Sequence, residues 1–214
     1  MTIEPGRRSQ HRTTPAHGEQ TKARLVAVAR EMFDRKGYSG VAMQDVCTEA
    51  EVTRGALYHH FPGKDELFRA VCEQVATDVT ARVTAAAQIK RDAWPRLVAG
   101  CRAFLDESAQ HDVRQILLTD APSVLGWAQL RDLDTRHGLG LVKLGIQRAI
   151  QEGAIESGPV ETLAHMLVSA LNEAAMLIGR SANPTNTRKD AMRALDRILV
   201  GIAGKRQPPA SSAR

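Results

Sequence analysis

Apolar residues recur at helical spacing along most of the chain, beginning with TKARLVAVAREMFDRKG at residues 21–37. The apolar positions fall at i, i+1, i+4, i+7 and i+8, which places them on one face of a helix. They are Leu25, Val26, Ala29, Met32 and Phe33. Gly37 follows and is typical of a residue that ends a helix. The stretch therefore predicts an amphipathic helix with one face against a core.

Two short helical segments and the start of a longer helix are predicted next. The order is a helix at residues 43–50, a break at residues 51–53 and a helix at residues 54–60. Pro62 and Gly63 then interrupt the pattern. A longer helix is expected from Lys64, because Asp65 and Glu66 suit the positive end of a helix dipole.

The rest of the chain has the pattern of further helices, and no segment alternates like a strand. The expected helices are residues 94–108, 113–120, 126–152, 160–180 and 187–203. We therefore expect an all-α protein. A three-helix N-terminal unit at residues 20–66 is joined through a linking helix to a C-terminal helical bundle within residues 67–204.

Composition supports a helical globular protein. Hydrophobic residues are 43% and charged residues 25% of 214 positions, whereas aromatic residues are only 4%, which favours helices over sheets. No apolar run approaches the ~20 residues that cross a bilayer, and the N-terminus lacks the apolar stretch of a signal peptide. The three cysteines, Cys47, Cys72 and Cys101, lack metal-type spacing. We expect a cytoplasmic protein with reduced thiols and no membrane association.

The candidate chemistry is concentrated in TRGALYHHFPGKDEL at residues 53–67. A helix, a short helix, a turn and another short helix form the outline of a helix-turn-helix, which places its last helix in the major groove of DNA. Thr53 is expected to cap that last helix with its hydroxyl. Leu57 and Phe61, four residues apart, would then face the first helix. The residues left facing outward are Arg54, Gly55, Ala56, Tyr58 and His59.

This outward face suits a polyanion, in keeping with the net charge of +5. Gly55 and Ala56 are small, so the helix can approach a groove closely, and Ala56 could touch a thymine methyl group. Tyr58 and His59 can donate to phosphate oxygens, and Lys64 lies one turn further on to do the same.

Two other interpretations apply to the same residues. Tyr58 could be a partly buried packing residue. His59 and His60 could be a metal pair, but neighbouring residues on a helix point about 100° apart and cannot share an ion without a third ligand. We expect no metal and no cofactor.

The stretch from Gly37 to Leu67 resembles the N-terminal DNA-binding domain of TetR-family transcriptional regulators. The resemblance is carried by Gly37-Tyr38, by VTRGALYHHF at residues 52–61 and by KDEL at residues 64–67. It implies that the positions contacting phosphates and bases are Gln44, Thr53, Arg54, Ala56, Tyr58, His59 and Lys64. The segment LLTDAPSVLGWAQLRDLD at residues 117–134 is more loosely similar to one C-terminal subgroup of the family.

Two positions depart from the family pattern. Val41 and Ala42 stand where a capping Thr or Ser is usual, which would cost about 1 kcal/mol and one phosphate contact. Glu51 stands at a turn position that is commonly glycine. Either the turn differs there or a left-handed residue is tolerated at about 1–2 kcal/mol.

Residues 1–19 and 205–214 lack periodicity and are expected to be tails. The first of them is a basic arm. It is either solvated or makes a loose electrostatic contact to DNA.

The last two predicted helices carry more apolar surface than one intramolecular contact needs. Together with the resemblance, this implies a homodimer joined by a four-helix intermolecular bundle. The expected interface residues are Leu163, Leu167, Ala170, Leu171, Ala174, Leu177, Met192, Leu195 and Leu199. The alternative is that they form only the core of the monomer.

The family mechanism implies a small-molecule effector in a mostly apolar pocket between the middle helices. Candidate contacts are Trp94, Phe104, Leu117, Asp120, Trp127, His137, Leu141, His165 and Met166. Packing roles are open for these residues too. Trp94 and Phe104 can anchor the core, His137 can be a hydrogen-bonded core histidine, and Asp120 can satisfy backbone groups at a helix break.

The sequence thus predicts a dimeric, sequence-specific DNA-binding transcriptional regulator, and favours a repressor that a small molecule releases from a palindromic operator. An enzyme is disfavoured, because the chain has no Gly-rich phosphate loop after a strand, no GxSxG or HExxH motif and no zinc spacing. A helical adaptor that binds only protein would leave TRGALYHHF without a role.

Overall fold

The computed structural model describes residues 15–204, and every regular element within that range is helical, as the periodicity predicts. The elements in chain order are α1 (Pro15–Lys36), α2 (Met43–Glu49), α3 (Arg54–His60), α4 (Lys64–Gln88), α5 (Ala93–Glu107), η1 (Val113–Asp120), α6 (Ala121–Val124), α7 (Gly126–Asp134), η2 (Thr135–Leu139), α8 (Gly140–Gln151), α9 (Val160–Arg180) and α10 (Pro184–Ala203).

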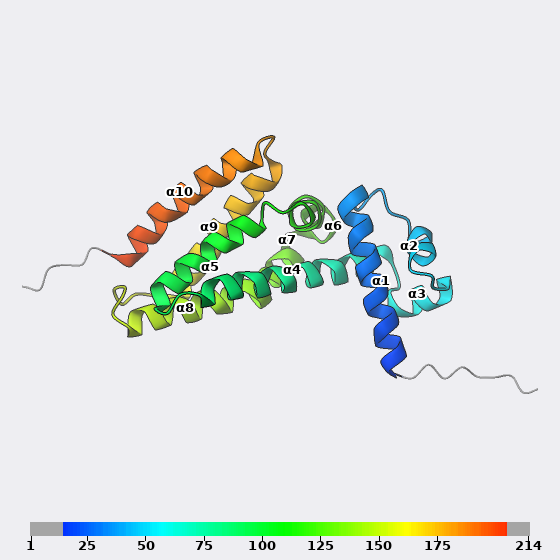
Figure 1. Ribbon diagram of the computed structural model, residues 1–214, viewed down its shortest axis with the longest axis horizontal. Coiled ribbons are helices and arrows are strands. Elements are labelled where there is room, and N and C mark those ends of the chain that lie inside the picture. Colours follow the sequence, from blue (N-terminus) through cyan, green and yellow to red (C-terminus); the bar gives the residue numbers. More distant parts are fainter. Residues whose placement is uncertain (1–14, 205–214) are drawn as a thin grey trace, which may run out of the picture.

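Helices α1 to α3 and the first part of α4 share one core. Phe33 of α1 and Phe68 of α4 are fully buried, and their rings meet edge to face with centroids 5.1 Å apart. Tyr38, in the turn after α1, lies 5.0 Å from Phe68. Leu57 fixes α3 into the same core. Figure 1 shows α2 and α3 beside α1 at one end of the molecule, with α4 leading away into the bundle.

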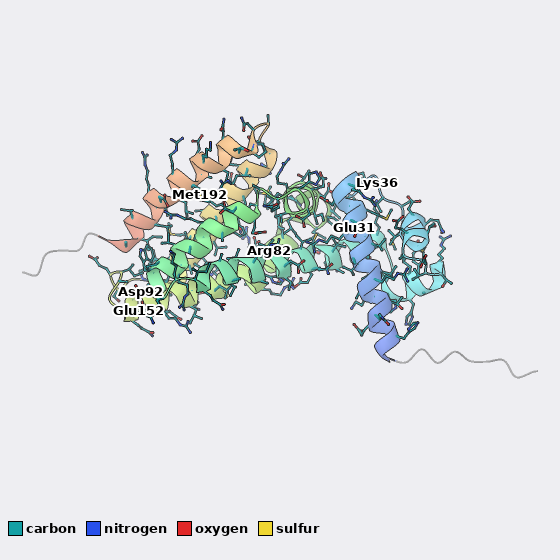
Figure 2. The ribbon with its side chains drawn as sticks, in the orientation of Figure 1. Glu31, Lys36, Arg82, Asp92, Glu152 and Met192 are labelled. Atoms are coloured by element: carbon teal, nitrogen blue, oxygen red, sulfur yellow. The ribbon has the colours of Figure 1, made fainter. Side chains whose placement is uncertain are left out.

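The remaining helices form the rear bundle, in which α5 packs against α4, α8 and α10, and α9 packs against α8 and α10. Leu105, Ile146, Ala164 and Ile178 are fully buried there. The start of α5 lies at the far end of the bundle, where Glu152 accepts a hydrogen bond from the Ala93 backbone N–H at 2.7 Å (Figure 2). The helices α5 and α8 to α10 thus have their own core, whereas the buried residues of η1, α6 and α7 belong to the core of the front helices.

Several helix bounds differ from those expected. α1 begins at Pro15, five residues inside the segment assigned to a disordered arm, and proline is tolerated in a first turn. The remainder of that arm and residues 205–214 lie outside the described residues. The single helix expected at residues 126–152 is divided into α7, η2 and α8, and η1 and η2 are π-helices. Periodicity did not reveal the π-helices, because each adds only one residue to a turn.

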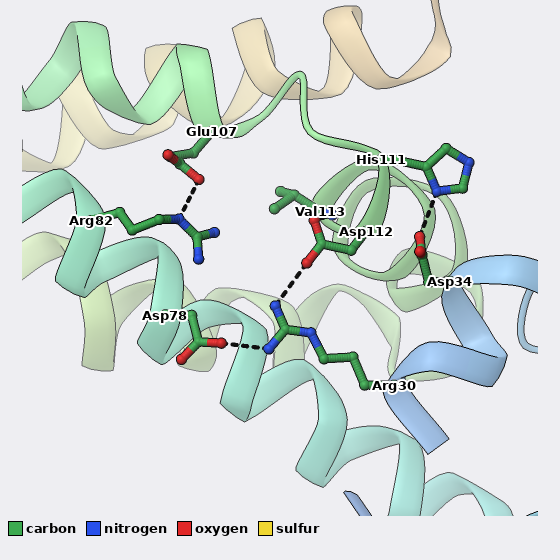
Figure 3. A network of polar contacts seen from close by, with 8 residues as sticks. All are labelled: Arg30, Asp34, Asp78, Arg82, Glu107, His111, Asp112 and Val113. Atoms are coloured by element: carbon green, nitrogen blue, oxygen red, sulfur yellow. Dashed lines mark hydrogen bonds and ion pairs between the residues drawn. The ribbon is translucent and has the colours of Figure 1, made fainter. Parts of the chain in front are cut away.

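Polar contacts join the front helices to the bundle. Arg30 of α1 donates to Asp112 at the start of η1, with Nη2 and Oδ2 2.7 Å apart, and also to Asp78 of α4 (Figure 3). One turn further along α1, Asp34 contacts His111, with Oδ1 and Nδ1 2.5 Å apart. The front helices are therefore attached to both α4 and the η1 region.

Helix α9 is the one described helix long and apolar enough to cross a membrane, which corrects the expectation that no such run exists. Only 33% of its most apolar window is buried within the chain. Asn172, near its middle, donates to Asp134 at 2.7 Å. α9 is therefore a bundle helix whose second apolar side has no partner within residues 15–204.

Candidate nucleic-acid interface

The start of α3 is fixed by its cap. The hydroxyl of Thr53 accepts a hydrogen bond from the Ala56 backbone N–H at 3.2 Å, as predicted. Leu57 and Phe61 are 0% and 4% exposed, so they do face inward. The cap and these two anchors set the rotation of α3, and that rotation decides which side chains face solvent.

The outward face carries the side chains expected there. Arg54, Gly55 and His59 are exposed, and Ala56 is half-buried. Tyr58 is 39% exposed, so part of its side chain is covered and part is accessible to a partner. A Cβ placed on Gly55 would meet no atom within 4 Å, so the surface is open at this point. The face therefore has space for a large partner.

The polar groups of this face have few partners within the protein. The Arg54 guanidinium lies 5.4 Å from the centroid of the Tyr58 ring, a cation–π contact on the surface. The His59 ring meets His60 at 5.3 Å. Gln44 is exposed on α2. Between residues 17 and 204, the side chains of Gln44, Arg54, Tyr58 and His59 form no hydrogen bond or ion pair, so they remain available to an external acceptor.

Lys64 stands at the first position of α4, next to α3. Its Nζ lies 4.1 Å from the centroid of the Tyr38 ring. Burial lowers the pKa of Lys64, against the opposing influence of Asp65 and Asp120. Lys64 is thus partly enclosed and held by an aromatic face.

Both departures from the family pattern are visible. Ala42 precedes α2 and makes no side-chain cap. Glu51 adopts φ 53°, so the turn keeps its left-handed residue without glycine. The Glu51 carboxylate pairs with Arg24 of α1, with Oε2 and Nη2 2.6 Å apart. That pair is exposed, but it places a cation beside the acid that would otherwise repel a phosphate backbone.

The expected interface residues of α9 and α10 separate into two groups. Leu167, Leu171, Leu195 and Leu199 are only 1–6% exposed and form the chain's own core, so for these four the monomer-core alternative applies. They face inward because they lie on the side of each helix that packs within the bundle. Leu177 is 54% exposed. The half-buried members of the set are Leu163, Ala170, Ala174 and Met192.

The nine candidate effector contacts differ in their exposure to solvent. Trp127, Leu141 and Met166 are 61%, 44% and 65% exposed, and His165 is also on the surface. Half-buried positions are occupied by Trp94, Phe104, Leu117, Asp120 and His137. Two hollows, of about 500 and 290 Å³, are lined by none of the nine. Neither of these two hollows is therefore the expected effector pocket.

Two of the candidates have specific polar roles instead. His137 contacts Glu73 of α4, with Nε2 and Oε1 2.5 Å apart, which agrees with a hydrogen-bonded histidine. Asp120 accepts from the backbone N–H of Tyr38 at 2.7 Å. It does satisfy a backbone group, but one in the front helices.

Sequence reasoning missed two features. Tyr38 was noted only as part of a motif, although it joins the aromatic core, Lys64 and Asp120. The second is Asp134, a half-buried acid that accepts a hydrogen bond from the Asn172 side-chain amide. The sequence does contain an indication of this position, because Leu130 and Leu133 lie near Asp134 on the same predicted helix. No group of three or more metal-binding side chains lies together among the residues that the structure describes.

Two family models match the chain. The model of bacterial regulatory proteins of the tetR family matches residues 25–71. The model of the tetracyclin repressor-like C-terminal domain matches residues 94–202. The first match covers the helix-turn-helix, and the second covers α5 to α10.

Similar proteins agree with these matches. The crystal structure of a TetR-family transcriptional regulator from Pectobacterium atrosepticum is 33% identical, with a TM-score of 0.83, covering 91% of this chain and 100% of that one. The TetC protein of transposon Tn10 from Escherichia coli is 27% identical over 149 residues, or 70% of this chain and 75% of TetC. The uncharacterised HTH-type transcriptional regulator YfiR of Bacillus subtilis is 26% identical over 171 residues, 75% and 80% of the two chains. The helix-turn-helix, the rear bundle and these likenesses together show that the chain belongs to the TetR family of transcriptional regulators.

Proposed function

We propose that this regulator is a homodimeric repressor that binds a palindromic operator through α3 and is released from it by a small molecule. The observation that carries the proposal is the outward face of α3. Within residues 17–204 its polar side chains form no hydrogen bond or ion pair, whereas the apolar anchors Leu57 and Phe61 are buried. A surface of this kind is suited to the major groove.

The proposed DNA contacts fall into two groups, contacts to base edges and contacts to phosphates. Arg54 and Gln44 are proposed to contact base edges, where each lost contact costs ~1–3 kcal/mol of discrimination. The main chain at Gly55 and the Ala56 methyl group allow close approach to the groove. The groups proposed to contact phosphates are Thr53, Tyr58, His59 and Lys64.

The homodimer is proposed from the unpaired side of α9 and α10. Met166 and Leu177, separated by about three helical turns, are large apolar residues on one exposed stripe of α9, with Ala170 between them. On α10, Ile198 is 42% exposed, and a Cβ on Gly201 would meet no atom within 4 Å. An apolar stripe flanked by small residues permits a close helix–helix contact with a second copy.

The proposal includes a small-molecule effector because the resemblance to the TetR family implies one. Its site is proposed in the rear bundle, where Phe104 and Leu117 are both half-buried and both pack against the front core. A panel of small apolar compounds should contain members that raise the melting temperature and release bound DNA, because a ligand of the folded state stabilises it. If compounds raised the melting temperature without releasing DNA, the repressor mechanism would be wrong.

An electrophoretic mobility shift with genomic fragments tests the DNA-binding function. Affinity should fall steeply between about 50 and 200 mM salt, since each neutralised phosphate adds close to 0.9 to the log–log slope. Arg54→Ala should change which fragments are retained, and Tyr58→Ala should weaken all fragments alike. An absence of binding at low salt would exclude the proposed function. We expect a cytoplasmic protein without catalytic activity.

A further inference from the structure

A carboxylate of the rear bundle holds the turn after α1. Oδ2 of Asp120 accepts from the Tyr38 backbone N–H at 2.7 Å and from the Gln115 side-chain amide at 3.1 Å. Gly37 has φ 67°, and a Cβ there would lie 3.2 Å from Nε2 of Gln115 and 3.6 Å from Oδ2 of Asp120. Glycine is therefore favoured at position 37 by its left-handed backbone, and a Cβ there would also crowd the end of the Gln115 side chain.

The side chain of Tyr38 connects that turn to the start of α4. Its ring packs against Phe33 and Phe68, with centroids 5.9 and 5.0 Å away. Its hydroxyl donates to Asp65, and burial together with this hydrogen bond raises the pKa of Tyr38 to about 12. The Lys64 ammonium lies against the ring, 4.1 Å from its centroid. An ammonium in this position is attracted by the ring face.

We propose that Asp120 positions Lys64 for DNA, acting through Tyr38. The carboxylate fixes the backbone that carries the ring, and the ring holds the ammonium at the edge of the α3 surface. This inference rests on the proposed assignment of Lys64 to DNA phosphates. Because Asp120 is the last residue of η1, a shift of η1 within the rear bundle would change how a DNA-contacting cation is presented.

A purely electrostatic role of Asp120 and a positioning role predict opposite changes in DNA affinity when Asp120 is removed, so the two can be distinguished. Asp120 is an acid in the neighbourhood of Lys64. If only its charge mattered, removing it would strengthen the binding of a polyanion. If its position matters, removing the acceptor should weaken binding, although the protein becomes more positive.

The experiment measures the affinity of full-length variants for a fluorescent duplex by anisotropy. Asp120→Ala should weaken binding about three- to tenfold, the effect of one lost hydrogen bond that orders a contact. Asp120→Asn keeps an oxygen that can accept from the Tyr38 N–H, so its affinity should stay within about twofold of wild type. Asp92→Ala, at the distant start of α5, is the matched control for loss of an exposed acid and should change little. Tighter binding by Asp120→Ala would overturn the proposal.

A double-mutant cycle shows whether the effect passes through Lys64. In a Lys64→Ala background, Asp120→Ala should weaken binding by less than about twofold, because the contact it positions is already lost. Full additivity of the two changes would overturn the proposal. It would leave DNA binding itself intact, whereas failure of the wild type to bind would reject the proposed function.

A second pair of variants covers the case in which Asp120→Ala does not fold. Tyr38→Phe keeps the ring beneath Lys64 and should bind as the wild type does. Tyr38→Leu removes the aromatic face and should weaken binding to the level of Lys64→Ala. Equal affinities for the two Tyr38 variants would contradict the role of the ring. The thermal unfolding of each variant shows that the affinities compared are those of folded protein.

Discussion

The front helices bury nearly all their large apolar side chains, whereas the rear bundle leaves several of its own in solvent. From α1 to α3, only Tyr58 among the large apolar residues is exposed. From α7 to α10, the exposed ones are Trp127, Leu141, Leu144, Met166, Leu177, Ile198 and Val200. The front unit is complete as a single chain and presents polar groups, while the rear unit presents apolar surface of the kind that a second chain covers.

The two regions also differ in where their polar and charged side chains lie. Arg54, Tyr58 and His59 of the α3 face are exposed and form no hydrogen bond or ion pair with the part of the chain that the structure describes. In the rear, Asp134 is half-buried beside Asn172, with Oδ2 and Nδ2 2.7 Å apart. Surface charge is suited to binding a polyanion, whereas a carboxylate whose pKa is raised by partial burial makes the bundle's stability depend on pH.

The largest effect is expected from placing a charge on the apolar stripe of the rear bundle. Leu177→Glu should weaken dimerisation by at least about 100-fold, since burying a carboxylate in an apolar contact costs several kcal/mol. Sedimentation velocity over a range of protein concentrations measures the change. Ile89→Glu, at an exposed apolar position after α4, is the control and should leave the dimer intact. A dimer that tolerates Leu177→Glu would place the interface elsewhere.

Asp134→Asn should give the next largest effect, which is a rise in the free energy of unfolding that occurs only at neutral pH. Burial raises the pKa of Asp134 to about 6 from an ordinary value of 3.8, although Arg131 and His137 oppose the shift. An acid whose pKa is raised by folding costs no stability below the unfolded value and its full cost above the folded one. We expect the variant to be more stable by about 2 kcal/mol at about pH 7.5 and unchanged at about pH 3, below the unfolded pKa.

Urea unfolding of wild type and variant at both pH values measures this difference. Taking the difference cancels the general effect of acid on the rest of the protein. A gain of equal size at both pH values would show that the side chain's shape, and not its ionisation, decides the outcome.

The missing cap of α2 provides a smaller test in the front helices. Ala42→Ser should stabilise the protein by about 0.5–1 kcal/mol, because its hydroxyl can accept from an N–H of the first turn that lacks a side-chain cap. Ala81→Ser, at an exposed position inside α4, should instead destabilise the protein slightly, since serine is a poorer helix former. Thermal unfolding compares the two. If both substitutions shifted the melting temperature in the same direction, the effect of Ala42→Ser would not come from capping.

Glu51→Gly should have the smallest effect, an increase of about 0.5 kcal/mol in the free energy of unfolding. Glycine removes the cost of a left-handed residue, but it also increases the entropy of the unfolded chain. The lost pair with Arg24 is exposed and contributes little. Glu49→Gly, at the end of α2, should be destabilising. Loss of stability at position 51 would show that the turn does not strain Glu51.

The sequence predicted the front helices better than the rear. The bounds of α3 and the inward positions of Leu57 and Phe61 follow from local spacing and one capping residue. The effector candidates in the rear were chosen by size and polarity, and neighbouring helices decide whether such residues face a cavity, the core or solvent. Leu167 and Leu177 lie on one helix, and periodicity alone does not show which of its two apolar sides packs within the chain. Contacts between distant segments, such as Asp120 with Tyr38, have no local signal.

Selection from a library of random duplexes tests the central claim most directly, which is that two copies of α3 are presented to DNA by a dimer held through the rear bundle. Wild-type protein should enrich an inverted repeat whose half-sites are centred about 34–36 Å apart, or a multiple of that distance. Leu177→Glu should enrich at most a single half-site, with lower affinity. Enrichment of one asymmetric site by the wild type, or of no sequence at all at low salt, would contradict the account.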